Sequence, residues 1–197
     1  MKKIKLSVLV LLAGLMGTSA VVAGEIDPAT VPAPKQTIAK KYLSAKEAAA
    51  LKQSLGNKAL LVDIRTQAEI TFVGEADAVD ANIPYMLANF STWDDKKGRF
   101  LLTQNATFVD KMDALVSKTG LNKESTIIVM CRSGDRSARA ADDLTKAGYT
   151  NVYSLVEGFE GDVAKDGPTA GKRTVNGWKN AGLPWSYKLE KDKMYID

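Results

Sequence analysis

Short apolar runs along the chain predict the strands of a sheet. The strongest run covers residues 127–130, with the sequence Ile-Ile-Val-Met, and a comparable run covers 59–64. Both are apolar at nearly every position rather than at alternate positions, which is typical of strands buried on both faces of a parallel sheet. A further strand is predicted over 151–156 and a short edge strand over 83–85.

Helical patterns separate these strands. Ser44 followed by Glu47 is a capping-box pattern that predicts a helix over residues 45–55, and Thr66 with Glu69 repeats the pattern. Apolar residues at helical spacing predict two more helices, over residues 108–120 and 136–148. Strands that alternate with helices indicate βαβ units, so we expect an α/β fold with a mostly parallel sheet.

Segments without a regular pattern mark the limits of the domain. Prolines and small residues make 24–39 an extended lead-in, and 188–197 form a charged tail, so the folded domain is expected over 40–187. Residues 71–104 lack a clear period, and we expect a loop over 93–99.

Residues 1–23 have the pattern of a secretory signal peptide. Lys2, Lys3 and Lys5 precede an apolar stretch at 6–16, and small residues follow it. The alternative, an uncleaved membrane anchor, is disfavoured because a span needs about 20 apolar residues. We therefore expect a periplasmic or secreted protein that has no membrane partner after cleavage. Cleavage lowers the formal net charge from +4 to +1, so no nucleic-acid partner is expected either.

Two residue counts narrow the chemistry. The chain has no histidine, which excludes Ser-His-Asp triads, Cys-His pairs and histidine metal sites. It has one cysteine, Cys131, which excludes an internal disulfide and a cysteine zinc cluster. We expect neither a metal nor a cofactor, and any sulfur or nucleophilic chemistry depends on Cys131.

A polar loop joins Cys131 to the next predicted helix. Its residues are Arg132, Ser133, Gly134, Asp135 and Arg136. Such residues favour a tight turn whose main-chain N–H groups form an anion-binding nest. The positive end of the following helix dipole and the two arginines add to the same point. Together they favour the thiolate form of Cys131 and the binding of a small oxyanion.

A second interpretation of Cys131 is structural. A lone cysteine after four apolar residues is usually a small core residue. An inert cysteine does not require neighbouring cations, which are costly to bury, so the two arginines favour a reactive thiol. In an oxidising compartment, a single unpaired cysteine also favours a functional role.

The Cys131 loop resembles the active-site loop of the rhodanese sulfurtransferases. Four other segments resemble motifs of that family in the same order: Leu61-Val62-Asp63-Ile64-Arg65 with Glu69, Ala81-Asn82-Ile83-Pro84, Val156-Glu157-Gly158-Phe159, and Trp178 with Ala181-Gly182-Leu183-Pro184. The resemblance implies a central five-stranded parallel sheet flanked by helices on both faces, and a persulfide on Cys131. It also implies substrate binding by residues 132–136 and a supporting role for Asp63, Arg65 and Ser137.

Two segments depart from the family pattern. Residues 71–104 and 160–177 are longer than usual, and we expect both to shape the mouth of the pocket. Four residues separate Cys131 from Arg136, which gives the pattern Cys-x4-Arg. Cysteine phosphatases have the longer pattern Cys-x5-Arg, and the related arsenate reductases resemble them in this. The shorter loop favours sulfur transfer over phosphoryl transfer.

The loop predicts a sulfurtransferase that works in two half-reactions. The Cys131 thiolate takes sulfur from thiosulfate or a related small sulfur-containing anion, and cyanide, a thiol or a protein acceptor then takes it from the persulfide. Two alternatives stay open: a non-catalytic persulfide carrier in periplasmic sulfur metabolism, and a phosphatase or arsenate reductase on the same fold.

Other residues are expected to be structural. Asp135 is predicted to cap the helix that follows it. Lys172 and Arg173 are expected in a solvated loop. Core or edge packing is expected for the three tryptophans, Trp93, Trp178 and Trp185.

Overall fold

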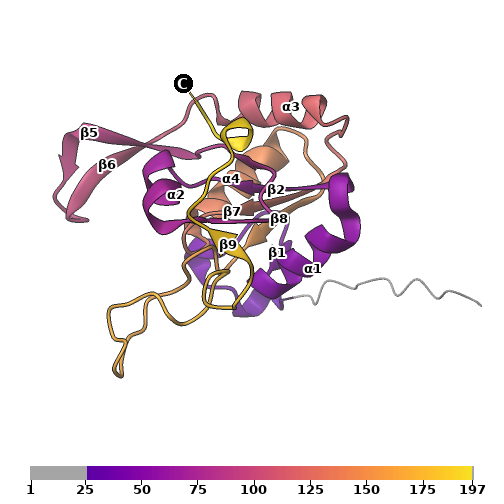
Figure 1. Cartoon of the computed structure of the whole chain (residues 1–197). Coiled ribbons are helices and arrows are strands. Elements are labelled where there is room, and N and C mark those ends of the chain that lie inside the picture. The colour runs from indigo at the N-terminus through magenta and orange to yellow at the C-terminus, as the bar shows by residue number, and fades with distance from the viewer. Residues whose placement is uncertain (1–25, 197) are drawn as a thin grey trace, which may run out of the picture.

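A five-stranded parallel sheet forms the centre of the molecule (Figure 1). The computed structural model describes residues 26–196, so the predicted signal peptide at 1–23 lies outside the described residues. The strands lie in the order β1-β8-β7-β2-β4, and every pairing in the sheet is parallel, as expected. Their bounds are β1 Tyr42–Leu43, β8 Val152–Leu155, β7 Thr126–Met130, β2 Ala59–Asp63 and β4 Ala81–Asn82.

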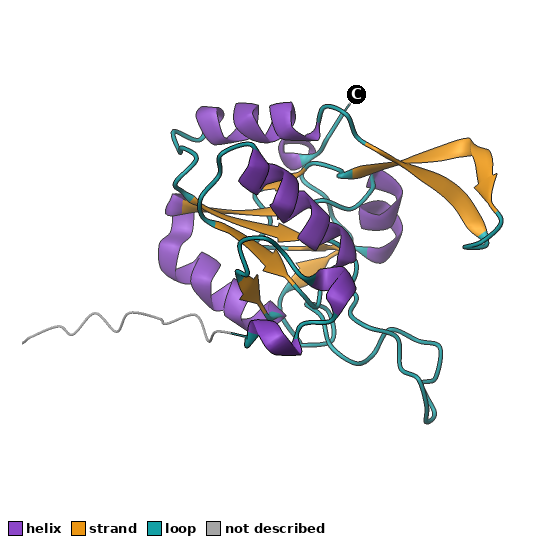
Figure 2. Cartoon of the chain, turned by 180° about the vertical axis from the view of Figure 1, so that it is seen from behind, coloured by secondary structure: helices purple, strands orange, loops and turns teal. Residues whose placement is uncertain are grey.

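Helices cover both faces of the sheet, which confirms the predicted fold class (Figure 2). On one face, α3 (Phe108–Lys118) and α4 (Asp135–Lys146) pack against the apolar side chains of β2 and β7. On the other face, α1 (Ala45–Leu55) packs with Trp178 from the C-terminal part of the chain. Alternate side chains of the central strands enter the two cores, which explains why these strands are apolar at every position.

Both predicted capping boxes are present. The Ser44 side chain accepts a hydrogen bond from the Glu47 N–H, and the Glu47 carboxylate accepts from the Ser44 N–H at the start of α1. Thr66 and Glu69 make the same pair of contacts at the start of α2 (Gln67–Val73). These bonds satisfy main-chain donors that a helix N-terminus otherwise leaves unpaired.

The segment predicted to be irregular contains a β-hairpin. Its strands β5 (Met86–Asp94) and β6 (Arg99–Gln104) pair antiparallel and project from the body of the molecule (Figure 1). The predicted loop at 93–99 is therefore too long, because its first two residues belong to β5 and its last residue belongs to β6. A register shift between Asn89 and Trp93 breaks the alternation of apolar and polar residues, which hides the strand period in the sequence.

The edge strand lies two residues earlier than predicted. Strand β4 ends at Asn82, and residues 83–85 continue beyond it in an irregular conformation. Ile83 and Tyr85 still donate main-chain hydrogen bonds, to the Asp63 and Ile64 carbonyls, and their side chains are buried. Their apolar character therefore reflects burial in the core rather than membership of a strand.

The chain segments outside the sheet pack onto the domain. The lead-in forms two short 3-10 turns, η1 (Pro28–Thr30) and η2 (Ala33–Lys35), and Lys35 Nζ lies 2.8 Å from the Asp162 carboxylate. Near the C-terminus, β9 (Trp185–Ser186) pairs antiparallel with β3 (Glu75–Ala76). Two more 3-10 turns are η3 (Gly56–Lys58) and η4 (Lys191–Lys193). Among residues 26–196, no helix is long and apolar enough to cross a bilayer.

The capping box of α1 should contribute measurably to stability. Ser44→Ala removes the acceptor of the Glu47 N–H, so we expect the free energy of unfolding to fall by about 1 kcal/mol in urea denaturation. Ser117→Ala, at an exposed position of α3, is the matched control and should change it by less than about 0.5 kcal/mol. Equal effects of the two substitutions would contradict a capping role for Ser44.

Candidate active site

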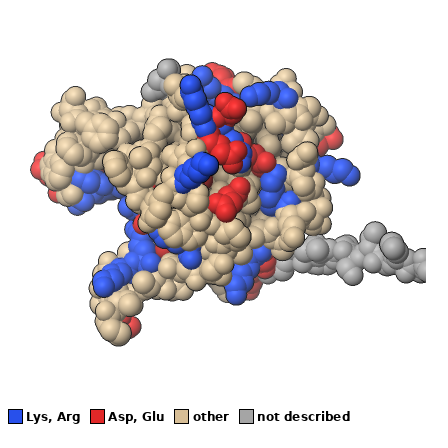
Figure 3. All heavy atoms as spheres, viewed as in Figure 1, with Lys and Arg blue, Asp and Glu red and all other residues tan. Residues whose placement is uncertain are grey.

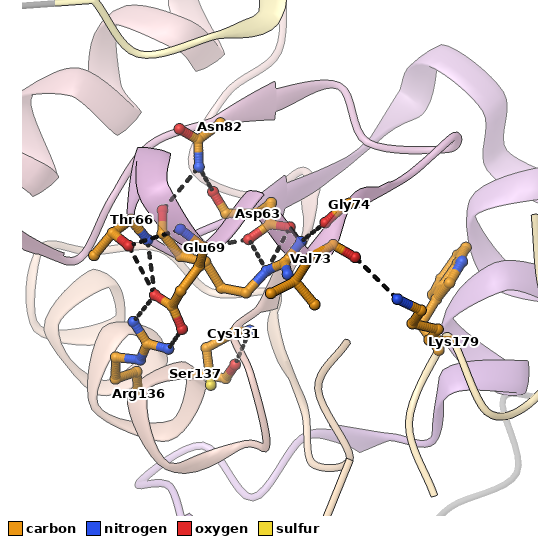
Figure 4. Close-up of polar contacts among 12 residues, drawn as sticks. Asp63, Thr66, Glu69, Val73, Gly74, Asn82, Cys131, Arg136, Ser137 and Lys179 are labelled. Atoms are coloured by element: carbon orange, nitrogen blue, oxygen red, sulfur yellow. Dashed lines mark hydrogen bonds and ion pairs between the residues drawn. The ribbon is translucent and has the colours of Figure 1, made fainter. Parts of the chain in front are cut away.

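Cys131 directly follows β7, beside the centre of the sheet, and the chain then turns into α4. The Cys131 N–H donates a hydrogen bond of 2.8 Å to the Ser137 hydroxyl oxygen (Figure 4). The Gly134 N–H donates to the Cys131 sulfur, with an N···Sγ distance of 3.2 Å. Ser137, predicted as a supporting residue, thus fixes the main chain of Cys131, and Gly134 contacts its reacting atom.

The main chain of the loop is arranged to bind negative charge. The N–H groups of Arg132, Ser133, Asp135 and Arg136 find no hydrogen-bond acceptor within residues 26–196. They surround the N-terminus of α4, where the helix dipole also favours an anion. The loop therefore has the donors of the predicted nest, and the helix adds a positive potential to it.

Glycine is required at the turn into α4. Gly134 is the N-cap residue, and its φ of 102° lies in the region that side chains rarely adopt. A Cβ atom there would collide with the Val156 carbonyl oxygen. The predicted cap at Asp135 is wrong, because Asp135 is the first helical residue and no side chain caps α4.

A second segment of the chain supports the loop from behind. Phe159 N–H donates to the Cys131 carbonyl at 2.8 Å, and the N–H groups of Glu160 and Gly161 donate to the Arg132 carbonyl. Gly158, with a φ of 66°, lies so close to the Arg132–Ser133 peptide that a Cβ atom would not fit. These bonds occupy the loop carbonyls and leave its N–H groups available.

Cys131 has features of both a core residue and a reactive thiol, the two interpretations of the sequence. It is only 1% exposed and belongs to the apolar core between the sheet and α4. It also lines a cavity of about 310 Å³, together with the loop residues Arg132, Ser133, Asp135 and Arg136. This cavity thus gives a small anion access to the sulfur.

The cavity is strongly cationic. Five basic residues line it, Lys97, Arg99, Arg132, Arg136 and Arg139, against the two acidic residues Asp94 and Asp135. Sequence reasoning did not identify Lys97 and Arg99, which come from the β5–β6 hairpin, or Arg139 on α4. Arg139 lies one helical turn after Arg136, a spacing that could have indicated it. The expectation that the segment 71–104 shapes the pocket mouth is confirmed, whereas no residue of the segment 160–177 lines this cavity.

Arg136 is bound to a carboxylate rather than left as a lone cation. Its guanidinium forms two hydrogen bonds with Glu69, at 2.5 and 2.7 Å (Figure 4). Burial raises the pKa of Glu69, but the hydrogen bonds and charge of Arg136 outweigh it and lower the pKa to about 2. The same carboxylate caps α2, so Glu69, which the sequence marked as a capping residue and as part of a family motif, joins α2 to the Cys131 loop.

Asp63 and Arg65 support the site without lining the cavity. Their ion pair is fully buried, with an Arg65 Nη2 to Asp63 Oδ2 distance of 2.6 Å. Burial lowers the pKa of Arg65, but Asp63 outweighs it and raises the pKa above the ordinary value. Arg65 also lies 4.0 Å from the centroid of the Phe159 ring, next to the segment that supports the Cys131 loop. The pair is therefore placed to hold β2, α2 and the segment after β8 together.

The other residues that were expected to be structural differ in burial. Lys172 is exposed, whereas Arg173 is half-buried and donates a 2.6 Å hydrogen bond to the Gly161 carbonyl. Trp178 is buried in the core, as expected. Trp93 is 53% exposed on the β5–β6 hairpin, so its expected packing role applies only to its contact with Phe100.

The Glu69–Arg136 pair should give a pH-dependent contribution to stability. Because its pKa is lowered, Glu69 stabilises the folded state above about pH 4.5 and loses this contribution as the pH falls towards 2. Glu69→Gln keeps a side chain suited to the capping box but removes the charge. We expect it to lower the free energy of unfolding at pH 7 by roughly 2 kcal/mol, and the loss should shrink between pH 5 and pH 3.

Glu47→Gln is the matched control for this substitution. Glu47 occupies the equivalent position in the other capping box, and no ion pair joins it to a basic residue among residues 26–196. Urea denaturation at several pH values compares the two variants. If both lose the same free energy with the same pH dependence, the pairing of Glu69 with Arg136 does not matter for stability.

Comparison with known proteins agrees with this fold. The model of the rhodanese-like domain matches residues 44–165. The uncharacterized protein RP600 of Rickettsia prowazekii is 32% identical over 136 residues, which cover 68% of this chain and 87% of that protein. Thiosulfate sulfurtransferase 16, chloroplastic, of Arabidopsis thaliana is 30% identical over 98 residues, which cover 50% of this chain and 68% of that protein.

A solved structure has the same architecture. The crystal structure of Rv0390 from M. tuberculosis superposes with a TM-score of 0.55 and 28% sequence identity, covering 74% of this chain and 96% of that chain. The match to the family model extends from the N-cap of α1 past β8, and so includes four of the five strands of the sheet, all but β1, and the Cys131 loop. On this match, the chain belongs to the rhodanese-like domain family.

Proposed function

We propose that this protein is a sulfurtransferase that carries sulfur on Cys131 as a persulfide. The observation that carries the proposal is the 3.2 Å contact between the Gly134 N–H and the Cys131 sulfur, in a cavity lined by five basic residues. Donors and cations around a sulfur favour its negatively charged forms, both thiolate and persulfide. Similarity to a thiosulfate sulfurtransferase of Arabidopsis supports a sulfur-containing anion as the donor.

The first half-reaction loads sulfur from thiosulfate or a related donor. The Cys131 thiolate attacks the outer sulfur of thiosulfate and forms a new S–S bond. The S–S bond of the donor breaks, its electron pair leaves with sulfite, and the enzyme holds a deprotonated persulfide. The N–H groups of Arg132, Ser133, Asp135 and Arg136 and the guanidinium of Arg132 bind the donor oxygens and the departing sulfite.

The second half-reaction returns Cys131 to its starting form. Cyanide attacks the outer sulfur of the persulfide through its carbon, the S–S bond breaks, and thiocyanate leaves while the electron pair returns to the Cys131 thiolate. A thiol acceptor reacts at the same sulfur. The charge on Cys131 is the same at the start and the end of the cycle, so one set of donors stabilises every state.

The loop fits sulfur transfer better than the alternatives from the sequence. Four residues separate Cys131 from Arg136, and Arg136 is held by Glu69 in a bidentate pair. A phosphatase or arsenate reductase would need this guanidinium to bind the oxyanion, which would leave the Glu69 carboxylate buried without its partner. A persulfide carrier uses the same half-reaction for loading and differs only in its slow release to small acceptors.

The same proposal includes a location outside the cytoplasm. The basic start, apolar stretch and small residues of 1–23 are the support for it. N-terminal sequencing of the protein from a periplasmic extract, with a mature end near residue 24, tests the location independently of the chemistry.

The chemistry predicts one added sulfur on Cys131 and nowhere else. After treatment with thiosulfate, intact mass spectrometry should show the wild-type protein heavier by the mass of one sulfur atom, and Cys131→Ser unchanged. Cyanide should remove the added mass and release thiocyanate. Wild-type protein blocked with iodoacetamide is the control, because Cys131 is the only cysteine of the chain.

Three outcomes would separate the functions. Loading without thiocyanate turnover identifies a carrier. Turnover of an aryl phosphate, in the absence of loading by any sulfur donor, identifies a phosphatase. Full sulfur loading of a correctly folded Cys131→Ser variant refutes the site assignment.

A further inference from the structure

Two projecting segments flank the cavity of Cys131. One is the β5–β6 hairpin and the other is the segment 160–177, which starts against the main chain of Arg132 (Figure 1). The space-filling view shows a hollow between them, at the left, where Lys and Arg side chains gather on the facing sides of both (Figure 3). These are the two segments that are longer than the family pattern.

Four of the five basic residues that line the cavity, all but Arg136, form no ion pair with the part of the chain that the structure describes. The Nε atoms of Arg99 and Arg132 are buried and have no hydrogen-bond acceptor there. Burial and the nearby charge of Arg132 lower the pKa of Arg173, which places a second guanidinium, on the segment 160–177, close to Arg132. Buried donors without acceptors are costly, which points to an anionic ligand with several acceptor groups.

The hairpin also exposes a group of aromatic side chains. Phe90, Trp93 and Phe100 are 66%, 53% and 46% exposed, and Phe100 contacts the other two edge to face. Phe100 is adjacent in sequence to Arg99, which lines the cavity. Clustered aromatic residues on a surface are typical of protein interfaces, where they bury large apolar areas. We refer to Phe90, Trp93 and Phe100 as the aromatic arm.

The cavity is large for a small anion alone. Its volume of about 310 Å³ lies at the lower end of the range of small-molecule sites, and it exceeds what thiosulfate, with its two sulfur and three oxygen atoms, requires. Cys131 is buried, so a thiol on a flat protein surface does not reach it. The space fits an acidic chain segment that enters the cavity with its cysteine foremost.

We infer that the sulfur acceptor is a protein that inserts an acidic, cysteine-bearing segment between the hairpin and the segment 160–177 and packs apolar side chains on the aromatic arm. This inference rests on the proposed sulfurtransferase function and names its acceptor. The acceptor thiolate attacks the outer sulfur of the deprotonated Cys131 persulfide and forms a new S–S bond. The S–S bond of the Cys131 persulfide breaks, its electron pair returns to the Cys131 thiolate, and the acceptor leaves as a deprotonated persulfide.

A protein fits this surface better than a membrane. Lysines and aromatic residues also suit the surface of an anionic bilayer. However, the basic residues line a cavity around a buried sulfur, where a bilayer cannot follow. Charge complementarity therefore favours an acidic polypeptide as the occupant.

Peptide binding tests the docking step without sulfur chemistry. The probes are two fluorescein-labelled peptides of equal length, each with a central Ser in place of Cys beside a Leu and a Phe. One is otherwise rich in Asp and Glu, and the other in Lys and Arg. In fluorescence anisotropy with the full protein, the acidic peptide should bind at least roughly ten-fold more tightly, and the difference should fall as salt screens the charges.

A double substitution tests the aromatic arm. Phe90→Thr with Trp93→Thr keeps residues suited to a strand, and should weaken binding of the acidic peptide by roughly ten-fold. Tyr187→Thr is the matched control, because Tyr187 is an aromatic residue of similar exposure outside the hairpin. Thiosulfate:cyanide turnover should stay within about two-fold of wild type in both variants, since none of the three residues lines the cavity.

The outcomes distinguish docking from sulfur transfer. Equal binding of the two peptides by the wild-type protein overturns the docking inference, whatever the variants do. Co-sedimentation with phosphatidylserine vesicles that is lost in the double variant, without preference for the acidic peptide, overturns it in favour of a membrane. Failure of the wild type to load sulfur, with peptide binding intact, overturns only the proposed function.

Discussion

The conformation of the main chain around Cys131 depends on hydrogen bonds from the segment 159–161. Three N–H groups of residues 159–161 occupy the carbonyls of Cys131 and Arg132, whereas four N–H groups of the loop have no acceptor among residues 26–196. Gly134 and Gly158 permit this close approach because a Cβ atom at either position would collide with the opposite main chain. The electrostatic environment of the sulfur is thus produced by backbone geometry, which no single charged side chain could replace.

Two ion pairs hold the elements that bear this loop. Asp63–Arg65 is fully buried beneath the segment after β8, and Glu69–Arg136 connects α2 with α4. Removing one partner of a buried pair is costly because the other charge is left without compensation. The pairs therefore set the relative positions of β2, α2 and α4, and Cys131 lies where these elements meet.

The hairpin changes what the site can accept. It contributes Lys97 and Arg99 to the cavity and carries Phe90, Trp93 and Phe100 on its exposed surface. A site made from the Cys131 loop alone would bind a small anion. With the hairpin beside it, the same sulfur lies within a larger cationic cavity next to an apolar surface, a combination suited to a polypeptide partner.

The sequence alone predicted those elements that depend on residues close together in the chain. The buried strands, both capping boxes and the glycine-containing loop after Cys131 could be predicted because period, cap and turn chemistry act within a few residues. The hairpin was missed because its register shift breaks the strand period. Only the tertiary structure decided that Glu69 binds Arg136, that Asp135 caps nothing, and that Arg99 and Arg139 share a cavity with Cys131. These contacts join residues far apart in the chain, and their energies depend on burial that only the folded state creates.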